Sequence, residues 1–245
     1  MNPQIAIIRD GPSDFLVLKK FISCIFQHHH QIELEEDNFF EFENTLNIIN
    51  ALSKYFDKST SEHALFSNIA GDVRRQIQQI ILTAILKFSK EKDLSLTNKD
   101  VLVLYGDAEK ILGSKEKYFE PWAYTINSIM WLAIEEFYHK MAGQGYEYQQ
   151  LPLILPIVLY PSSEILVASC MDDFDKTNYR QFNARPALKQ HVYETESIPL
   201  AIHNGTLAEV LNTFIVPESL SKVYKDLPEV RKFMQILTFS NPPQK

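Results

Sequence analysis

Three short apolar segments, each followed directly by a polar turn, constrain the fold of this chain more than any other feature. They are residues 4–9 (QIAIIR), 100–105 (DVLVLY) and 151–159 (LPLILPIVL). Because apolar residues run through them without alternation, they predict strands buried on both faces, as in a parallel sheet covered by helices. Pro152 and Pro156 favour a strand end or an edge position for the third segment, since proline donates no backbone hydrogen bond.

Helical patterns separate these predicted strands. Ser13 is a candidate N-cap for a helix from Asp14 to about His28, and Pro121 opens a helix that runs to about Met141. Strand, tight turn and helix in this order are typical of the beginning of a doubly wound fold. We therefore expect the α/β class, with a mostly parallel, Rossmann-like sheet flanked by helices.

The segment from about 40 to 95 has a different pattern. Apolar residues recur at three- and four-residue intervals from Phe40 to Lys92, which predicts two or three helices. That is more than one crossover between strands needs, so we interpret the segment as a helical insertion in a single domain over residues 1–245. A separate helical domain is the alternative, but no linker rich in Gly, Pro or Ser flanks the segment.

Charge and hydropathy exclude several classes of protein. The chain has 24 Lys and Arg against 31 Asp and Glu residues, a formal net charge of −7. This excludes a protein that binds nucleic acid mainly through its own positive field. No apolar stretch reaches the ~18 residues of a membrane-spanning helix, so we expect a cytoplasmic protein without a membrane segment. Cys24 and Cys170 lie in apolar surroundings, which predicts buried, reduced thiols.

Acidic residues occupy the polar turns after the three predicted strands. Asp10 and Asp14 follow the first strand, Asp107 and Glu109 the second, and Glu164 the third. The carboxyl ends of parallel strands face one crevice, where such folds bind ligands. Carboxylates gathered there favour Mg²⁺ or Mn²⁺, which can activate water for hydrolysis of a phosphodiester. The alternative is that these acids only begin helices, whose dipole favours negative charge.

Several motifs resemble the topoisomerase–primase (TOPRIM) family. IAIIRDGPSDFLVLKKF resembles its opening strand, acid-Gly turn and helix, and VLVLYGDAE resembles its Asp-x-Asp element. PSSEILVASCMDDFD resembles the third, Ser/Glu-bearing element of small standalone TOPRIM-like proteins, while ARPALKQHV and DLPEVRKFMQIL are similar to their basic helix and closing segment. Such proteins often lie beside ATPases in bacterial defence loci and are related to nucleases of the overcoming-lysogenization-defect type.

The resemblance implies a role for each acidic residue. It makes Asp10 and Asp107 catalytic, with Asp10 as general base or first metal ligand. It also implies the metal ligands Asp10, Asp14, Asp107, Glu109 and Glu164, with Mg²⁺ or Mn²⁺ as cofactor. The family usually has Glu at the first position and Asp-x-Asp at the second element. Asp10 is therefore one methylene shorter than its counterpart, and Glu109 is one methylene longer.

Two basic residues follow the third element. Arg185 and Lys189 lie four residues apart, so a helix would present them on one face, where they would hold a phosphate. A solvated surface pair is the alternative.

Two functions are open at this point. The first is a Mg²⁺-dependent TOPRIM-like nuclease that acts as a subunit of a bacterial complex for defence against phages or plasmids. The second is a degenerate TOPRIM-like scaffold that binds a partner protein, such as an ATPase, and does not cut. Since the chain is acidic, binding to nucleic acid is expected to be assisted by a partner under either function.

Overall fold

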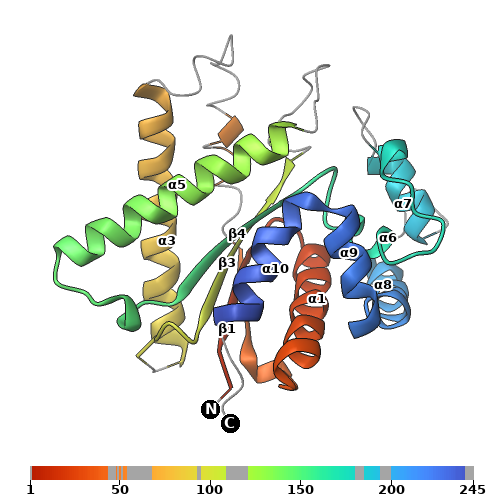
Figure 1. Ribbon diagram of the computed structural model, residues 1–245, viewed down its shortest axis with the longest axis horizontal. Coiled ribbons are helices and arrows are strands. Elements are labelled where there is room, and N and C mark those ends of the chain that lie inside the picture. Colours follow the sequence, from red (N-terminus) through yellow and green to blue (C-terminus); the bar gives the residue numbers. More distant parts are fainter. Residues whose placement is uncertain are drawn as a thin grey trace.

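The three predicted strands pair in one sheet, together with a fourth that the sequence analysis did not predict (Figure 1). The structure is a computed structural model. It describes Ile48, Asn50, Leu52, Ser53 and residues 2–43, 68–92, 95–108, 121–179, 185–193 and 200–240. Among these residues the sheet is entirely parallel and has helices on both faces, which confirms the expected α/β class. The arrangement is consistent with a Rossmann-like fold.

The order of the strands in the sheet is β2-β1-β3-β4. Their bounds are Ile5–Arg9 for β1, Phe39–Glu43 for β2, Val101–Asp107 for β3 and Leu153–Leu159 for β4. Every residue of β1, β3 and β4 is buried, as their continuous apolar runs predict. Within the described part of the chain β4 is an edge strand, as expected from Pro156.

Strand β2 corrects the helical prediction for the segment that begins at Phe40. Residues Phe39–Glu43 form a parallel strand beside β1, so the predicted insertion starts with a strand. Phe40 and Phe42 contact the ring of Phe88, whereas Glu41 pairs with Arg9 of β1. The alternation of Phe and Glu here is a two-residue strand period. Most of residues 44–67 lie outside the described residues.

Helices cover the two faces of the sheet in two groups. On one face lie α1 (Pro12–His30) and α10 (Pro228–Ser240), and on the other lie α3 (Asn68–Lys92) and α5 (Pro121–Gly143) (Figure 1). Helix α1 connects β1 to β2, whereas the later connections lead to β3 and β4 on the other side of β1. The direction of winding therefore reverses between β1 and β3. Doubly wound folds bind ligands at the carboxyl ends of the strands at this point.

The beginning of α1 differs from the predicted N-cap. Gly11 is the N-cap and Pro12 opens the helix, so Ser13 lies inside the first turn. The backbone N–H of Gly11 donates a 2.7 Å hydrogen bond to Oδ2 of Asp14. Asp14 therefore closes the turn between β1 and α1, and this contact fixes its carboxylate close to the end of β1.

The remaining helices lie mostly at one end of the sheet, as Figure 1 shows. The other helices are α6 (Glu164–Ala168), α7 (Arg185–Tyr193), α8 (Leu200–Phe214) and α9 (Leu220–Asp226), with 3₁₀ turns at Glu36–Asn38, Tyr148–Gln150, Lys176–Tyr179 and Pro217–Ser219. No helix in the described ranges is long and apolar enough to cross a membrane.

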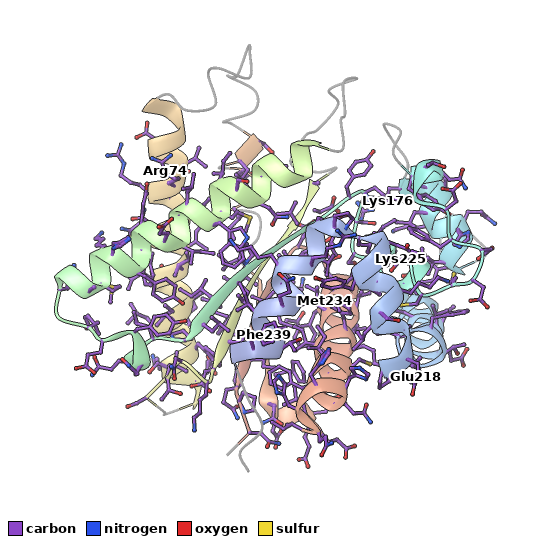
Figure 2. All side chains as sticks on the ribbon, viewed as in Figure 1. Arg74, Lys176, Glu218, Lys225, Met234 and Phe239 are labelled. Carbon is purple, nitrogen blue, oxygen red and sulfur yellow. The ribbon has the colours of Figure 1, made fainter. Side chains whose placement is uncertain are left out.

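One hydrophobic core extends through the sheet and its covering helices. On the α1 face, the rings of Phe21 and Phe233 stack with their centroids 6.5 Å apart, which joins α1 to α10. Figure 2 shows that side chains fill the space between these helices and the sheet. Both cysteines are free thiols; Cys24 is buried, as predicted, whereas Cys170 is only half-buried.

Candidate functional site

Three predicted acids and two predicted basic residues meet at the carboxyl ends of the strands. Nη1 of Arg185 lies 3.6 Å from Oδ2 of Asp107, and Nζ of Lys189 lies 3.9 Å from Oε1 of Glu164. Asp14 is close enough to Glu164 for the two negative charges to interact. We call these five side chains the acidic centre. The sequence predicted them from separate motifs, and the fold brings them together.

Two serine hydroxyls orient the carboxylates of the acidic centre. Oγ of Ser163 donates a 2.6 Å hydrogen bond to Oδ1 of Asp14, and Oγ of Ser162 donates a 2.5 Å hydrogen bond to Oε2 of Glu164. The first of these bonds joins residues 149 positions apart and ties the start of α1 to the turn after β4. Both carboxylates are therefore held in one orientation by rigid elements.

The carboxylates of the acidic centre are almost completely buried. Asp107 is 0% exposed, Glu164 2% and Asp14 5%. Buried carboxylates are costly unless cations and hydrogen bonds compensate them. Burial lowers the pKa of Arg185, but the charges of Asp107 and Glu164 raise it by more, so the guanidinium stays positive. Arg185 and Lys189 keep about a third of their side-chain surface in solvent, and they connect the buried acids to the surface.

Asp14 is the carboxylate with the largest resolved perturbation. Burial, together with the negative charges of Glu164 and Asp10, raises its pKa from 3.8 to about 6, against the opposing hydrogen bonds from Ser163 and Gly11. The neighbouring carboxylates therefore oppose the ionisation of Asp14. A carboxylate in this state titrates near neutral pH and can accept a proton.

The raised pKa of Asp14 gives a pH dependence of stability. An acid whose pKa is higher in the folded than in the unfolded state binds more protons when folded, so its contribution is present below pH 4 and is lost as the pH rises through 6. We expect the free energy of unfolding of the wild type, relative to Asp14→Asn, to fall by about 2 kcal/mol between pH 4.5 and 7.5. Urea unfolding of both proteins in EDTA measures this difference. A difference that stays constant with pH would contradict it.

The other two predicted acids are Asp10 and Glu109. Asp10 follows β1 directly, is half-buried, and its charge contributes to the raised pKa of Asp14. Glu109 lies outside the described residues.

Asp10, Asp14, Asp107 and Glu164 offer carboxylate oxygens, which are the ligands that a hard divalent cation prefers. As folded here, however, no three His, Cys, Asp or Glu side chains among the described residues are grouped to bind one metal ion.

Two tyrosines complete the surroundings of the acidic centre, and the sequence analysis missed both. Tyr105 is fully buried in β3, and burial together with the charges of Asp14 and Asp107 raises the pKa of its hydroxyl. Tyr193 follows Lys189 by one turn on α7, and burial and the charge of Glu164 raise its pKa. The signal was present in the spacing, because residues two apart in a strand share a face. The predicted strand ended at Tyr105, so Asp107 was assigned to a turn.

Comparisons of this chain with protein-family models, with curated proteins and with solved structures give no match.

Proposed function

We propose that this protein is a metal-dependent nuclease of the TOPRIM-like type, which hydrolyses phosphodiester bonds at the acidic centre. One observation supports this most. Carboxylates from three separate strand ends converge at the point where the winding of the sheet reverses, and two cations reach them from α7. Carboxylates beside cations that extend to the surface are residue types that can bind a divalent cation and a phosphate together.

The residues of the acidic centre, together with the neighbouring Asp10, divide into two roles in this proposal. Asp10, Asp14, Asp107 and Glu164 would hold Mg²⁺ or Mn²⁺, which when bound would supply an activated water and neutralise charge on the phosphate. Arg185 and Lys189 would then turn from the carboxylates to the phosphate of the substrate. Their ion pairs of 3.6 and 3.9 Å are longer than hydrogen bonds, so little direct bonding is lost when they turn.

Asp14 is the best candidate in the acidic centre for moving a proton. With a pKa of about 6 it is mostly ionised at neutral pH, yet it is basic enough to take a proton from an attacking water. The hydrogen bonds from Ser163 and Gly11 fix the direction of its oxygens. The TOPRIM resemblance gives the role of general base to Asp10 instead, so the variants Asp10→Asn and Asp14→Asn compare the two assignments.

Binding of metal to the folded state gives a direct test. At Mg²⁺ concentrations about 100 times the dissociation constant, binding adds roughly 2.7 kcal/mol of stability, which raises the melting temperature of a chain of this size by about 5–10 °C. We expect this shift for the wild type in thermal unfolding, and its loss in Asp107→Asn. A melting temperature of the wild type that does not respond to millimolar Mg²⁺ or Mn²⁺ would argue against the metal site.

We further propose that the nuclease works within a bacterial defence complex against phages or plasmids. The net charge of −7 gives the chain no positive field of its own for DNA or RNA. A partner, for which an ATPase is the first candidate, would therefore bring the nucleic acid to the acidic centre. Copurification from the native host, followed by a nuclease assay with and without the partner, tests this part.

A non-catalytic scaffold is the second candidate function, and a different observation favours it. Asp107 and Glu164 are fully or almost fully buried and already face the cations of α7, which is also how a structural ion-pair network looks. In that case the centre only ties α7 to the sheet. Cleavage of single- and double-stranded DNA and RNA, assayed with Mg²⁺ and with the copurifying partner, separates the two functions.

A further inference from the structure

Helix α7 closes the acidic centre toward the solvent. The side chains of Arg185 and Lys189 on this helix are partly exposed, whereas Asp107 and Glu164, which they face, are buried, and so is Asp14. A ligand from solvent can reach these carboxylates only after a covering group moves. Because the two cations of α7 connect the carboxylates to the surface, the position of this helix controls access to the centre.

The polar attachment of α7 to the acidic centre consists of ion pairs without hydrogen bonds. Nη1 of Arg185 is 3.6 Å from Oδ2 of Asp107, and Nζ of Lys189 is 3.9 Å from Oε1 of Glu164. Both distances exceed those of hydrogen bonds. Ion pairs whose cations keep contact with water contribute little to stability. These contacts therefore direct α7 to the centre but do not fix it there firmly.

The apolar attachment of α7 is short. Leu188 and Val192 lie one turn apart on one face of the helix and are buried, and α7 lies beside α6 and α8 at the periphery of the molecule (Figure 1). Helices as short as the nine residues of α7 are marginal in water without packing. If this face separates from its neighbours, we therefore expect α7 to unfold locally, while the sheet and its covering helices stay folded.

Two buried polar groups of the acidic centre favour such an opening. In the described part of the chain, the hydroxyl of Tyr105 and Nε of Arg185 are buried and form no hydrogen bond. Both groups interact with the charges of Asp14, Asp107 and Glu164. Burial of an unpaired polar group is costly, and water would bond to both groups once α7 moved away. This cost of the closed position lowers the free energy needed to open it.

We propose that α7 is an autoinhibitory lid on the acidic centre. In the closed position, Arg185 and Lys189 occupy the carboxylates, and local opening of α7 makes the carboxylates accessible to a divalent cation. The closed position agrees with the finding that no three acidic side chains in the described ranges are grouped to bind one ion. The inference rests on the proposed function, and it adds a step that precedes metal binding.

Hydrogen exchange of the full chain, measured by mass spectrometry in EDTA and in Mg²⁺, tests the lid. If Mg²⁺ binds only the open form, about 99% of the molecules are open at 100 times the dissociation constant. We therefore expect the amides of residues 185–193 to lose nearly all of their protection in Mg²⁺, while those of α10 keep theirs. This response is unusual, because a bound ion normally slows exchange throughout the protein that it stabilises.

Two other results are informative. If Mg²⁺ raises the melting temperature but leaves the protection of α7 unchanged or increases it, the ion reaches the centre without movement of α7. This inference then fails, and the proposed nuclease stands. If Mg²⁺ changes neither the melting temperature nor the exchange of α7, both fail.

The variant Leu188→Ala loosens the lid without changing any charge. Because a buried leucine is lost, we expect the amides of α7 to exchange at least about 30-fold faster in EDTA. A larger open fraction also raises the apparent affinity for Mg²⁺, measured by isothermal titration calorimetry with magnesium chloride, by about the same factor. Val192→Ala removes less side chain and should show both effects to a smaller degree, which keeps the test valid if Leu188→Ala does not fold. Unchanged or weaker affinity in folded variants would overturn the proposal.

Leu237→Ala is the matched control. Leu237 is also a fully buried leucine, but it lies on α10. This variant should lower the melting temperature, while the exchange of α7 in EDTA and the affinity for Mg²⁺ stay as in the wild type. Equal tightening of Mg²⁺ binding by Leu188→Ala and Leu237→Ala would reflect general loosening of the fold and would contradict a lid.

Discussion

Replacing Asp107 by alanine is expected to reduce metal-dependent cleavage of nucleic acid by at least about 100-fold. Asp107 is the last residue of β3, is fully buried, and lies at the switch between β1 and β3. Changes to groups that only support a metal ligand cost 10–100-fold in activity or affinity, so loss of a ligand itself costs at least as much. Initial rates on labelled DNA and RNA, with Mg²⁺ and with EDTA, measure the effect.

Two further variants separate a loss of activity in Asp107→Ala from a loss of folding. Asp107→Asn keeps the size of the side chain but removes its charge, so it should lose activity while staying folded. Glu229→Gln is the matched control, because Glu229 is also a buried carboxylate in an ion pair, with Lys176 at 3.0 Å, but outside the acidic centre (Lys176 is labelled in Figure 2). It should lower stability and leave cleavage unchanged. Equal cleavage by the wild type and Asp107→Asn would contradict the proposed site.

The largest loss of stability is expected for Phe21→Ala. Phe21 is fully buried in α1 and stacks on Phe233 of α10, so its removal leaves a cavity between the two helices on that face of the sheet. Truncation of a buried phenylalanine costs about 3–5 kcal/mol, which lowers the melting temperature of a chain of this length by roughly 6–20 °C. Calorimetry or circular dichroism during heating measures this shift.

Phe239→Ala is the control for the core variant. Phe239 lies on the last turn of α10, is labelled in Figure 2, and is 77% exposed. Its truncation should change the melting temperature by no more than about 2 °C, because little of its surface leaves water on folding. A shift as large as that of Phe21→Ala would mean that another surface covers this side chain in solution.

The sequence was informative about the sheet because three of its strands are buried on both faces. Such strands must be apolar throughout, so β1, β3 and β4 are visible as continuous runs in the sequence. Strand β2 was not predicted because it is short and two of its five residues are Glu, while a stronger helical pattern follows it. The start of α1 was predicted within two residues, since Asp10-Gly11-Pro12 is a strong turn signal.

The candidate residues were predicted in part, and their arrangement was not. Acids at strand ends follow from local patterns, and the spacing of Arg185 and Lys189 indicated one helix face, which α7 confirms. Tyr105 was missed for a specific reason. The side chains of a strand alternate between its faces, so Tyr105 and Asp107 share a face only if the strand includes both. The predicted strand stopped two residues short of Asp107, so the prediction did not relate the two side chains.

The sequence by itself therefore determined the α/β class, three of the strands and the acids at their ends, because local apolar patterns and turn residues encode these features. The tertiary structure alone decided that Arg185 faces Asp107, that Lys189 faces Glu164 and that Ser163 binds Asp14. These contacts join segments far apart in the chain, and no local pattern encodes which of them meet. The order of the strands decides it, since it brings their carboxyl ends to one edge of the sheet.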